Sequence, residues 1–235
     1  VPSKSLIRSA KILHYAKRAR DFGFKTAEVD YAFADVMDRV KGIIKKIEPH
    51  DSIERYTKLG VDCYTGAARI VSPYEVVVDG KTLTTRSIVV ATGARPFVPP
   101  IPGLEQVDYL TSDTVWDLTE LPARMVVLGG GPIGCELAQA FSRMGAKVTQ
   151  VEMASQIMGR EDPEVAELMR QRFESEGVTV LTDHKAKAIE IENDEKILIC
   201  EHGGQDVRVG FDAILVAVGR KANAKGFGLE EIGIT

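Results

Sequence analysis

The first 60 residues carry apolar side chains at the three- and four-residue intervals that are typical of amphipathic helices. One such pattern occupies residues 3–23, and a stronger one runs from Phe33 to Ile47. Pro49 interrupts the second pattern, and Gly60 ends a weaker helical stretch that follows it. The sequence therefore predicts that this part of the chain is helical.

The pattern changes after residue 60 to short runs rich in β-branched residues. Asp79–Gly80 is a typical hairpin turn, so this region is predicted to be a small antiparallel meander. The proline-rich stretch "ARPFVPPIPG" at 94–103 is not expected to continue a strand or a helix, and together with the residues up to Pro122 it is predicted to be a linker. The predicted strands are 61–70, 75–80 and 82–93.

From Met125 onward, strand-like and helix-like segments alternate with short connections. This order favours an α/β fold with a parallel sheet, followed by an antiparallel β-meander and a last buried strand. The predicted strands are 125–129, 147–151, 178–181, 185–192, 195–201, 206–210 and 211–219, and the predicted helices are 132–144 and 163–176.

Three glycines follow the first of these strands with the spacing G-x-G-x-x-G. Gly129 permits a tight turn, Gly131 lets a pyrophosphate approach the backbone, and Gly134 lets the following helix pack closely on the strand. The start of that helix offers free N–H groups and the positive end of the helix dipole. We therefore predict a dinucleotide-binding loop.

Glu152 ends the next strand, where a carboxylate accepts hydrogen bonds from ribose hydroxyls and repels a 2′-phosphate. No arginine follows it directly, although Arg160 lies further along the chain. We therefore expect NAD(H) in preference to NADP(H).

Composition excludes several other classes of function. The net charge is −4 with both signs interspersed, which gives no basic surface for nucleic acid, and no apolar run is long enough to span a bilayer. The three cysteines and four histidines are scattered, without metal-ligand spacing. Cys135 is expected to be a small core residue. We expect a cytoplasmic protein without a metal, a nucleic-acid partner or a membrane segment.

Three stretches, taken together and in this order, resemble the flavoprotein disulfide reductases. They are "IVVATGARPFVPPIPG", "VVLGGGPIGCELAQAFSRMGAKVTQVE" and "AILVAVGR". Glu152 and the run "MGREDPEV" are most similar to the dihydrolipoamide dehydrogenase and mercuric reductase branches. The resemblance implies a Rossmann-like NAD-binding domain at 122–221, preceded by a partial FAD-binding domain at 1–121 and followed by a return segment at 222–235.

The opening "VPSK" resembles the segment that directly follows the redox-active CxxxxC of this family. By this resemblance, both redox cysteines and the first FAD-phosphate loop would precede Val1. The second Gly-Asp strand and a dimerisation domain with a His-Glu pair would follow Thr235. We therefore expect the central portion of a longer, homodimeric enzyme, and no disulfide reductase turnover from these 235 residues alone.

The resemblance also assigns roles to individual residues. Lys4 would lie near the flavin, paired with Glu136 on the helix that follows the glycine loop. Pro132 stands where some relatives place an aromatic gate, and "GRKAN" departs from the usual G-R-x-P-N. The residues carried over to cofactor binding are Gly66, Ala68, Ala91, Thr92, Gly93, Gly129, Gly131, Pro132, Ile133, Gly134, Glu152, Gly219 and Arg220.

The predicted function is an NAD(H)-dependent flavin oxidoreductase that passes a hydride between NAD(H) and FAD and acts on a disulfide or a metal ion, in cell redox homeostasis. Two alternatives stay open. One is a flavin NADH oxidase without a catalytic disulfide, and the other is an NAD-binding module without turnover.

Overall fold

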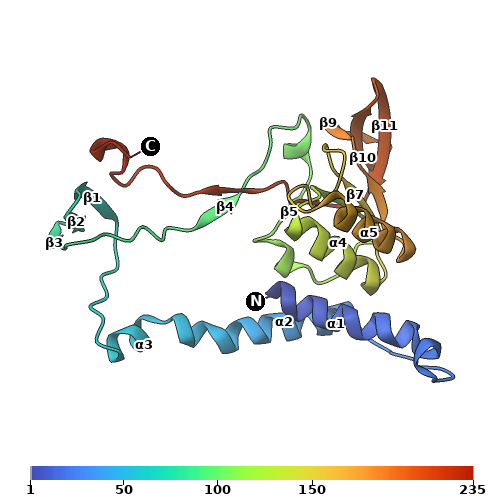
Figure 1. Ribbon diagram of the computed structural model, residues 1–235, viewed down its shortest axis with the longest axis horizontal. Helices are drawn as coiled ribbons and strands as arrows, with labels where there is room; N and C mark the ends of the chain where they lie inside the picture. The colour runs from blue at the N-terminus through green and yellow to red at the C-terminus, as the bar shows by residue number, and fades with distance from the viewer. Residues whose placement is uncertain (1, 235) are drawn as a thin grey trace. The chain divides into compact units, whose positions relative to one another are not determined.

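The computed structural model describes residues 2–234 (Figure 1). Val1, the first residue of the "VPSK" segment, and Thr235, the end of the predicted return segment, lie outside the described residues. The chain forms two compact units, each built from separate stretches: the residues up to Lys45 with Pro96–Gly219, and Lys46–Arg95 with the residues from Arg220 on. These units describe packing, and the cofactor domains with boundaries at 121 and 221 stay a prediction.

The first unit is built on a five-stranded sheet in the order β5-β12-β6-β7-β8. Every neighbouring pair in it is parallel, as the alternation of strands and helices predicted. The strands are β5 (Tyr109–Thr111), β6 (Arg124–Leu128), β7 (Lys147–Val151), β8 (Thr179–Leu181) and β12 (Ala213–Val216).

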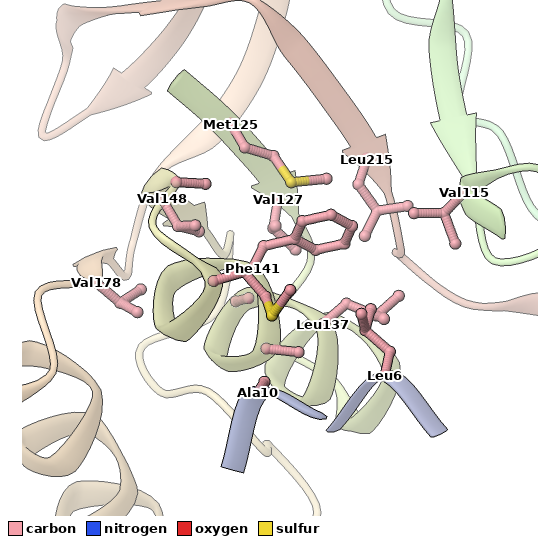
Figure 2. Packing of buried hydrophobic residues seen from close by; sticks show 14 of the residues in the cluster. Leu6, Ala10, Val115, Met125, Val127, Leu137, Phe141, Val148, Val178 and Leu215 are labelled. Atoms are coloured by element: carbon pink, nitrogen blue, oxygen red, sulfur yellow. The ribbon is translucent and has the colours of Figure 1, made fainter. Parts of the chain in front are cut away.

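Two helices connect the central strands of this sheet. They are α4 (Pro132–Met144) and α5 (Pro163–Ser175), within one residue of the predicted bounds. Gly145 ends α4 with φ of 111°, the left-handed conformation expected of a helix-terminating glycine. The apolar face of α4 is buried in the core beneath the sheet, and Figure 2 shows Phe141 beside Val127, and Leu137 near Leu6 of helix α1.

Two N-terminal helices, α1 (Pro2–Lys17) and α2 (Phe33–Ile47), extend the same core. Leu6 and Ala10 of α1 are buried beside α4 (Figure 2), and Met37 and Val40 of α2 belong to the same cluster. The prediction of one helix over 3–23 was wrong at its end, because α1 stops at Lys17 and a separate 3-10 turn, Ala19–Phe22, follows it.

The opposite face of the sheet packs against the predicted antiparallel meander. Its strands are β9 (Lys185–Glu192), β10 (Glu195–His202) and β11 (Gln205–Phe211). Asn193 and Asp194 both have positive φ, 48° and 65°, as a two-residue hairpin turn requires. Leu198 and Phe211 of the meander pack on Val126, Ile214 and other residues of the parallel sheet. The parallel sheet is therefore covered on both faces.

The second unit contains the small antiparallel sheet β1-β2-β3. Its strands are shorter than predicted, since 61–67 and 85–93 form no strand. The apolar run around Val89 has the composition of a strand, but no strand pairs with it among residues 2–234 and the Val89 side chain is 88% exposed. The elements are a 3-10 turn Glu48–Asp51, α3 (Ile53–Lys58), β1 (Ala68–Ser72), β2 (Glu75–Val78), β3 (Lys81–Thr84), β4 (Ala94–Pro96), β13 (Arg220–Ala222) and a 3-10 turn Glu230–Ile232.

The prediction of a linker over 94–122 was wrong in two places. Ala94–Pro96 forms strand β4, which pairs with β13, and Tyr109–Thr111 forms strand β5 at the edge of the parallel sheet. Short 3-10 turns at Leu104–Gln106 and Val115–Asp117 place Leu104 and Val115 in the core. No helix in the described part of the chain is long and apolar enough to cross a membrane.

Candidate functional site

The glycine loop joins β6 to α4, and two of its glycines are required by their surroundings. A Cβ on Gly129, where φ is 116°, would lie 2.5 Å from the carbonyl oxygen of Ala217 at the end of β12. A Cβ on Gly134 would lie 2.2 Å from the carbonyl oxygen of Gly129 itself. Both distances are shorter than any side chain tolerates, so these glycines let α4 start directly against the loop.

Gly131 has the opposite environment, since nothing lies within 4 Å of the position its Cβ would take. It is the N-cap of α4, and Pro132 occupies the first helical position, where no N–H is needed. The first-turn amides of a helix have no acceptor within the helix and carry the positive end of its dipole. The loop therefore leaves open space beside a site suited to an anion.

Glu152 follows the last residue of β7, and both of its carboxylate oxygens are held by backbone amides. Its Oε2 accepts from the N–H of Gly130 at 2.6 Å, and its Oε1 accepts from the N–H of Ala154 at 2.8 Å. The side chain is half-buried. Each oxygen keeps a free lone pair, so this fixed carboxylate can still accept hydrogen bonds from hydroxyl groups.

These groups line one cleft of about 660 Å³, a size typical of sites for small molecules and cofactors. It lies at the carboxyl ends of β6, β7 and β12. From β6 the chain continues to β7, which pairs with β6 on one side, whereas β12 pairs with β6 on the other side. In open parallel sheets, ligands bind at such a point, where the strand order reverses. The lining also includes Phe97, Pro99, Ile101, Ile133, Met158, Arg160, Lys185 and Gly219.

Two positively charged side chains line the cleft and are relevant to whether it prefers NAD(H) or NADP(H). Arg160 and Lys185 line it together with Glu152, although no ion pair with Glu152 is found among the described residues. Sequence reasoning noted Arg160 but missed Lys185. The preference for NAD(H) over NADP(H) therefore stays a prediction that rests on Glu152.

A histidine pair borders the same cleft and was also missed. His184 lines the cleft, and its ring stacks on His202 with centroids 4.2 Å apart and planes 10° from parallel. Its Nδ1 donates to the carbonyl oxygen of Thr182 at 2.5 Å, since that oxygen only accepts, and this bond fixes the orientation of the ring. The sequence held no signal for this pair, because the two histidines are 18 positions apart, one just before β9 and one at the end of β10, and no motif connects them.

Cys135 lies beneath the loop in the second turn of α4 and is 1% exposed. Burial raises the pKa of its thiol to about 11, so the sulfur is a protonated thiol at neutral pH. The prediction that Cys135 is a core residue is confirmed. Cys200 is also buried, with its pKa raised to about 11 by burial, and it belongs to a different hydrophobic cluster.

Lys4 and Glu136 both lie in the first unit, on α1 and α4, which pack together. Both side chains are exposed, and the structure places no ion pair between them. Their pairing beside a flavin stays a prediction.

The remaining predicted residues lie in the second unit, apart from Gly219. Thr92 Oγ1 donates to the carbonyl oxygen of Asn223 at 2.6 Å, and the N–H of Asn223 donates to the carbonyl oxygen of Gly93 at 3.0 Å. Arg220 donates to the carbonyl oxygen of Ala94. The "ATG" and "GRKAN" segments are therefore held together, and Asn223 is the residue of this group that sequence reasoning did not single out.

Gly66 and Ala68 belong to the edge of the small sheet. A Cβ on Gly66 would lie 2.1 Å from the Asp79 carboxylate, which also accepts from the N–H of Ala67 at 3.2 Å. The turn residue Asp79 therefore fixes the backbone at Gly66, and the structure gives a structural reason for this glycine. Its predicted contact with FAD is not tested.

A parallel sheet with a glycine loop at one strand end and a fixed carboxylate at the next defines an α/β protein of the dinucleotide-binding type. The chain belongs to the pyridine nucleotide-disulphide oxidoreductase family, whose model matches residues 1–235. FAD and NAD(H) are the cofactors of this family, and the open Gly131 and the fixed Glu152 suit the nucleotide.

Relatives with established names match along the whole chain. A mercuric reductase of Staphylococcus aureus is 31% identical over 234 residues, and a dihydrolipoyl dehydrogenase of Acholeplasma laidlawii is 33% identical over 239 residues. The chain spans 43% of the first relative and 69% of the second. Among solved structures, the Cu(II) complex of the HOCl-induced flavoprotein disulfide reductase RclA from Escherichia coli is similar with a TM-score of 0.81. That protein is 25% identical, and the match covers all of this chain and 50% of the other.

Proposed function

We propose that this chain is the NAD(H)-binding portion of a flavin-dependent oxidoreductase that acts on a disulfide or on mercuric ion. The observation that carries the proposal is the geometry around Glu152, whose two oxygens are fixed by Gly130 and Ala154 beside the open position at Gly131. A carboxylate so held is set to accept hydrogen bonds from the hydroxyls of a ribose, while the start of α4 receives the pyrophosphate.

The protein's contribution is binding and orientation. The amides of the loop and of the first turn of α4 neutralise the pyrophosphate, and Glu152 fixes the adjacent ribose. The end of β12, at Ala217 and Gly219, forms the far wall of the cleft. A bound NAD(H) supplies or accepts the hydride.

Disulfide chemistry requires thiols that this stretch of 235 residues does not bring together. Cys63 is exposed in the second unit, while Cys135 and Cys200 are buried in separate clusters of the first. We therefore propose that the reacting cysteines belong to another part of a longer protein. The relatives' names support mercuric ion or a dihydrolipoyl group as its substrate, and the sequence resemblance supports a cytoplasmic homodimer.

The experiment is a titration of the 235-residue chain with NADH, followed by the fluorescence of the reduced nicotinamide. We expect saturable binding that Glu152→Gln weakens about tenfold, since it removes a charged acceptor. Glu164→Gln, an exposed carboxylate in the first turn of α5, is the matched control and should bind as the unmodified chain does. No saturable binding, or equal affinity in all three proteins, would contradict the proposal.

A further inference from the structure

Gln150 is a polar residue fully buried within strand β7, two positions before Glu152. Its side chain is 0% exposed. Its Nε2 donates to the carbonyl oxygen of Gly129 at 3.0 Å and lies 3.4 Å from Cys135 Sγ. Its Oε1 is buried with no hydrogen-bond partner, the one such side-chain atom found among residues 2–234.

The orientation of this amide follows from its neighbours. The Gly129 carbonyl only accepts hydrogen bonds, so turning the amide round would set two acceptors against each other. Nε2 must therefore face the loop, and Oε1 is left without a partner. An apolar side chain of similar volume would avoid that cost but would leave the buried Gly129 carbonyl without this donor. The role of the amide is therefore to hold that carbonyl of the loop.

Gln150 and Glu152 hold the same peptide unit from opposite sides. Gln150 binds the carbonyl of Gly129, and Glu152 Oε2 accepts from the N–H of Gly130 at 2.6 Å. In a trans peptide the C=O and N–H point in opposite directions, and no cis peptide occurs among the described residues. Fixing the carbonyl on the buried side therefore turns the N–H toward Glu152 at the edge of the cleft, so this amide holds the carboxylate and is not free for a phosphate.

Cys135 repeats this arrangement one peptide further on. Its Sγ donates to the carbonyl oxygen of Gly130 at 3.3 Å, and the N–H of Met158 also donates to that oxygen at 2.6 Å. By the same geometry, the N–H of Gly131 is turned away from the buried side, toward the open space beside Gly131.

We infer that Gln150 is a positioning residue for the glycine loop. It holds the Gly129–Gly130 peptide directly, and through Cys135 it supports the next peptide, whose Gly131 N–H faces the pyrophosphate subsite. This inference rests on the proposed function. Gln150 does not line the cleft itself, and its amide hydrogen-bonds to Gly129 of the loop and to Cys135. Its effect should therefore be largest for the part of the ligand that the loop binds.

The test compares three ligands in the 235-residue chain and in Gln150→Met. NADH and ADP-ribose carry a pyrophosphate, and adenosine does not. We expect Gln150→Met to weaken the first two about tenfold, as loss of one hydrogen-bonded support of the loop implies, and adenosine by about threefold at most, because Ala154 still holds the Glu152 carboxylate. Resistance to urea should change little, because the substitution removes the orphaned oxygen and also the hydrogen bond to the buried Gly129 carbonyl.

Three further variants serve as controls. Gln171→Met makes the same change on the surface of α5, where the amide donates to Glu167, and should bind all three ligands normally. Cys135→Ala should weaken NADH by a smaller factor, and Cys135→Ser, which keeps a donor beneath Gly130, should restore it.

The outcomes separate this inference from the proposed function. Full NADH affinity in Gln150→Met, or an equal loss for all three ligands, would overturn the inference while the proposed function stands. An unmodified chain that binds none of the ligands would overturn both.

Discussion

Arg143, in the last turn of α4, binds the carboxylate of Glu176 through two parallel hydrogen bonds of 2.7 and 2.9 Å. Glu176 is only 5% exposed, and Arg172 also donates to it at 2.6 Å. Burial alone would raise the pKa of Glu176, but Arg143, His14 and Arg172 hold it below its usual value. One carboxylate at the end of α5 therefore ties α1 and α4 to that helix.

The first prediction follows from this burial. Glu176→Gln should lower the free energy of unfolding by about 2–3 kcal/mol, because it leaves the partly buried Arg143 without a counter-charge. Urea unfolding followed by circular dichroism measures the change. Glu174→Gln removes an exposed carboxylate of the same helix, which pairs with Arg170, and should change the free energy by no more than about 0.5 kcal/mol. Equal effects of the two variants would contradict this role for Glu176.

The second prediction concerns pH. Burial lowers the pKa of His14 below 6.5, and Arg143, Arg172 and Arg18 oppose its protonation while Glu176 favours it. The folded chain therefore binds a proton at His14 less readily than the unfolded chain. The contribution to stability is complete above the unfolded pKa near 6.5 and decreases as the pH falls through that value toward the lower, folded pKa.

Neutral His14 also accepts hydrogen bonds that a proton would remove. Arg172 lies 2.9 Å and Arg18 lies 3.3 Å from its Nε2. We expect the chain to lose stability between pH 8 and pH 5.5 relative to His14→Gln, whose side chain stays neutral. Urea midpoints of both proteins over this range give the comparison. A difference that does not vary with pH would show that His14 stays in one protonation state throughout.

The third prediction uses two glycines with opposite surroundings. Gly134→Ala places a Cβ against the Gly129 carbonyl and should cost about 1–3 kcal/mol and abolish tight NADH binding, since α4 must move away from the loop. Gly42→Ala, inside α2 with nothing within 4 Å, should stabilise the chain by up to about 1 kcal/mol. Thermal unfolding and NADH titration of both variants test the pair. Stabilisation by Gly134→Ala would contradict the close approach.

The fourth prediction concerns the choice of nucleotide. Glu152→Ala combined with Met153→Arg replaces a carboxylate with a cation beside the ribose, and Met153 is 71% exposed on the cleft lining. The ratio of NADPH to NADH affinity should rise at least about tenfold, because a 2′-phosphate is no longer repelled. Glu164→Ala serves as the control. An unchanged ratio would mean that Glu152 does not face the ribose.

The sequence predicted most elements of the parallel sheet, its helices and the meander to within a residue or two, because these elements are long, periodic and bounded by prolines, glycines and turn residues. Pro132 and Gly145 mark the two ends of α4, and Asn193–Asp194 turns the hairpin between β9 and β10. The glycine spacing also located the cleft, since Gly129 and Gly134 are required by close backbone contacts and Gly131 leaves open space between them.

Other features depend on contacts that a single sequence does not display. Strand β5 has three residues and becomes a strand only by pairing with β12. The run at Val89 has the composition of a strand, but no strand of the described residues 2–234 pairs with it. The role of Gln150 could not be predicted for a related reason. A polar residue in an apolar strand indicates that it has a hydrogen-bond partner, but only the structure shows that this partner is the carbonyl of Gly129.

The segment between Phe97 and Gly219 begins and ends at one place, because the N–H of Phe97 donates to the carbonyl oxygen of Gly219 at 3.0 Å. A segment whose ends are close together can be inserted into another chain as a unit, because the insertion needs only two neighbouring backbone positions in that chain. The loop-closure entropy lost on insertion is then small. Helices α1 and α2 lie outside this segment but pack on α4 in the same core. An inserted segment would therefore need other apolar side chains to bury that face of α4.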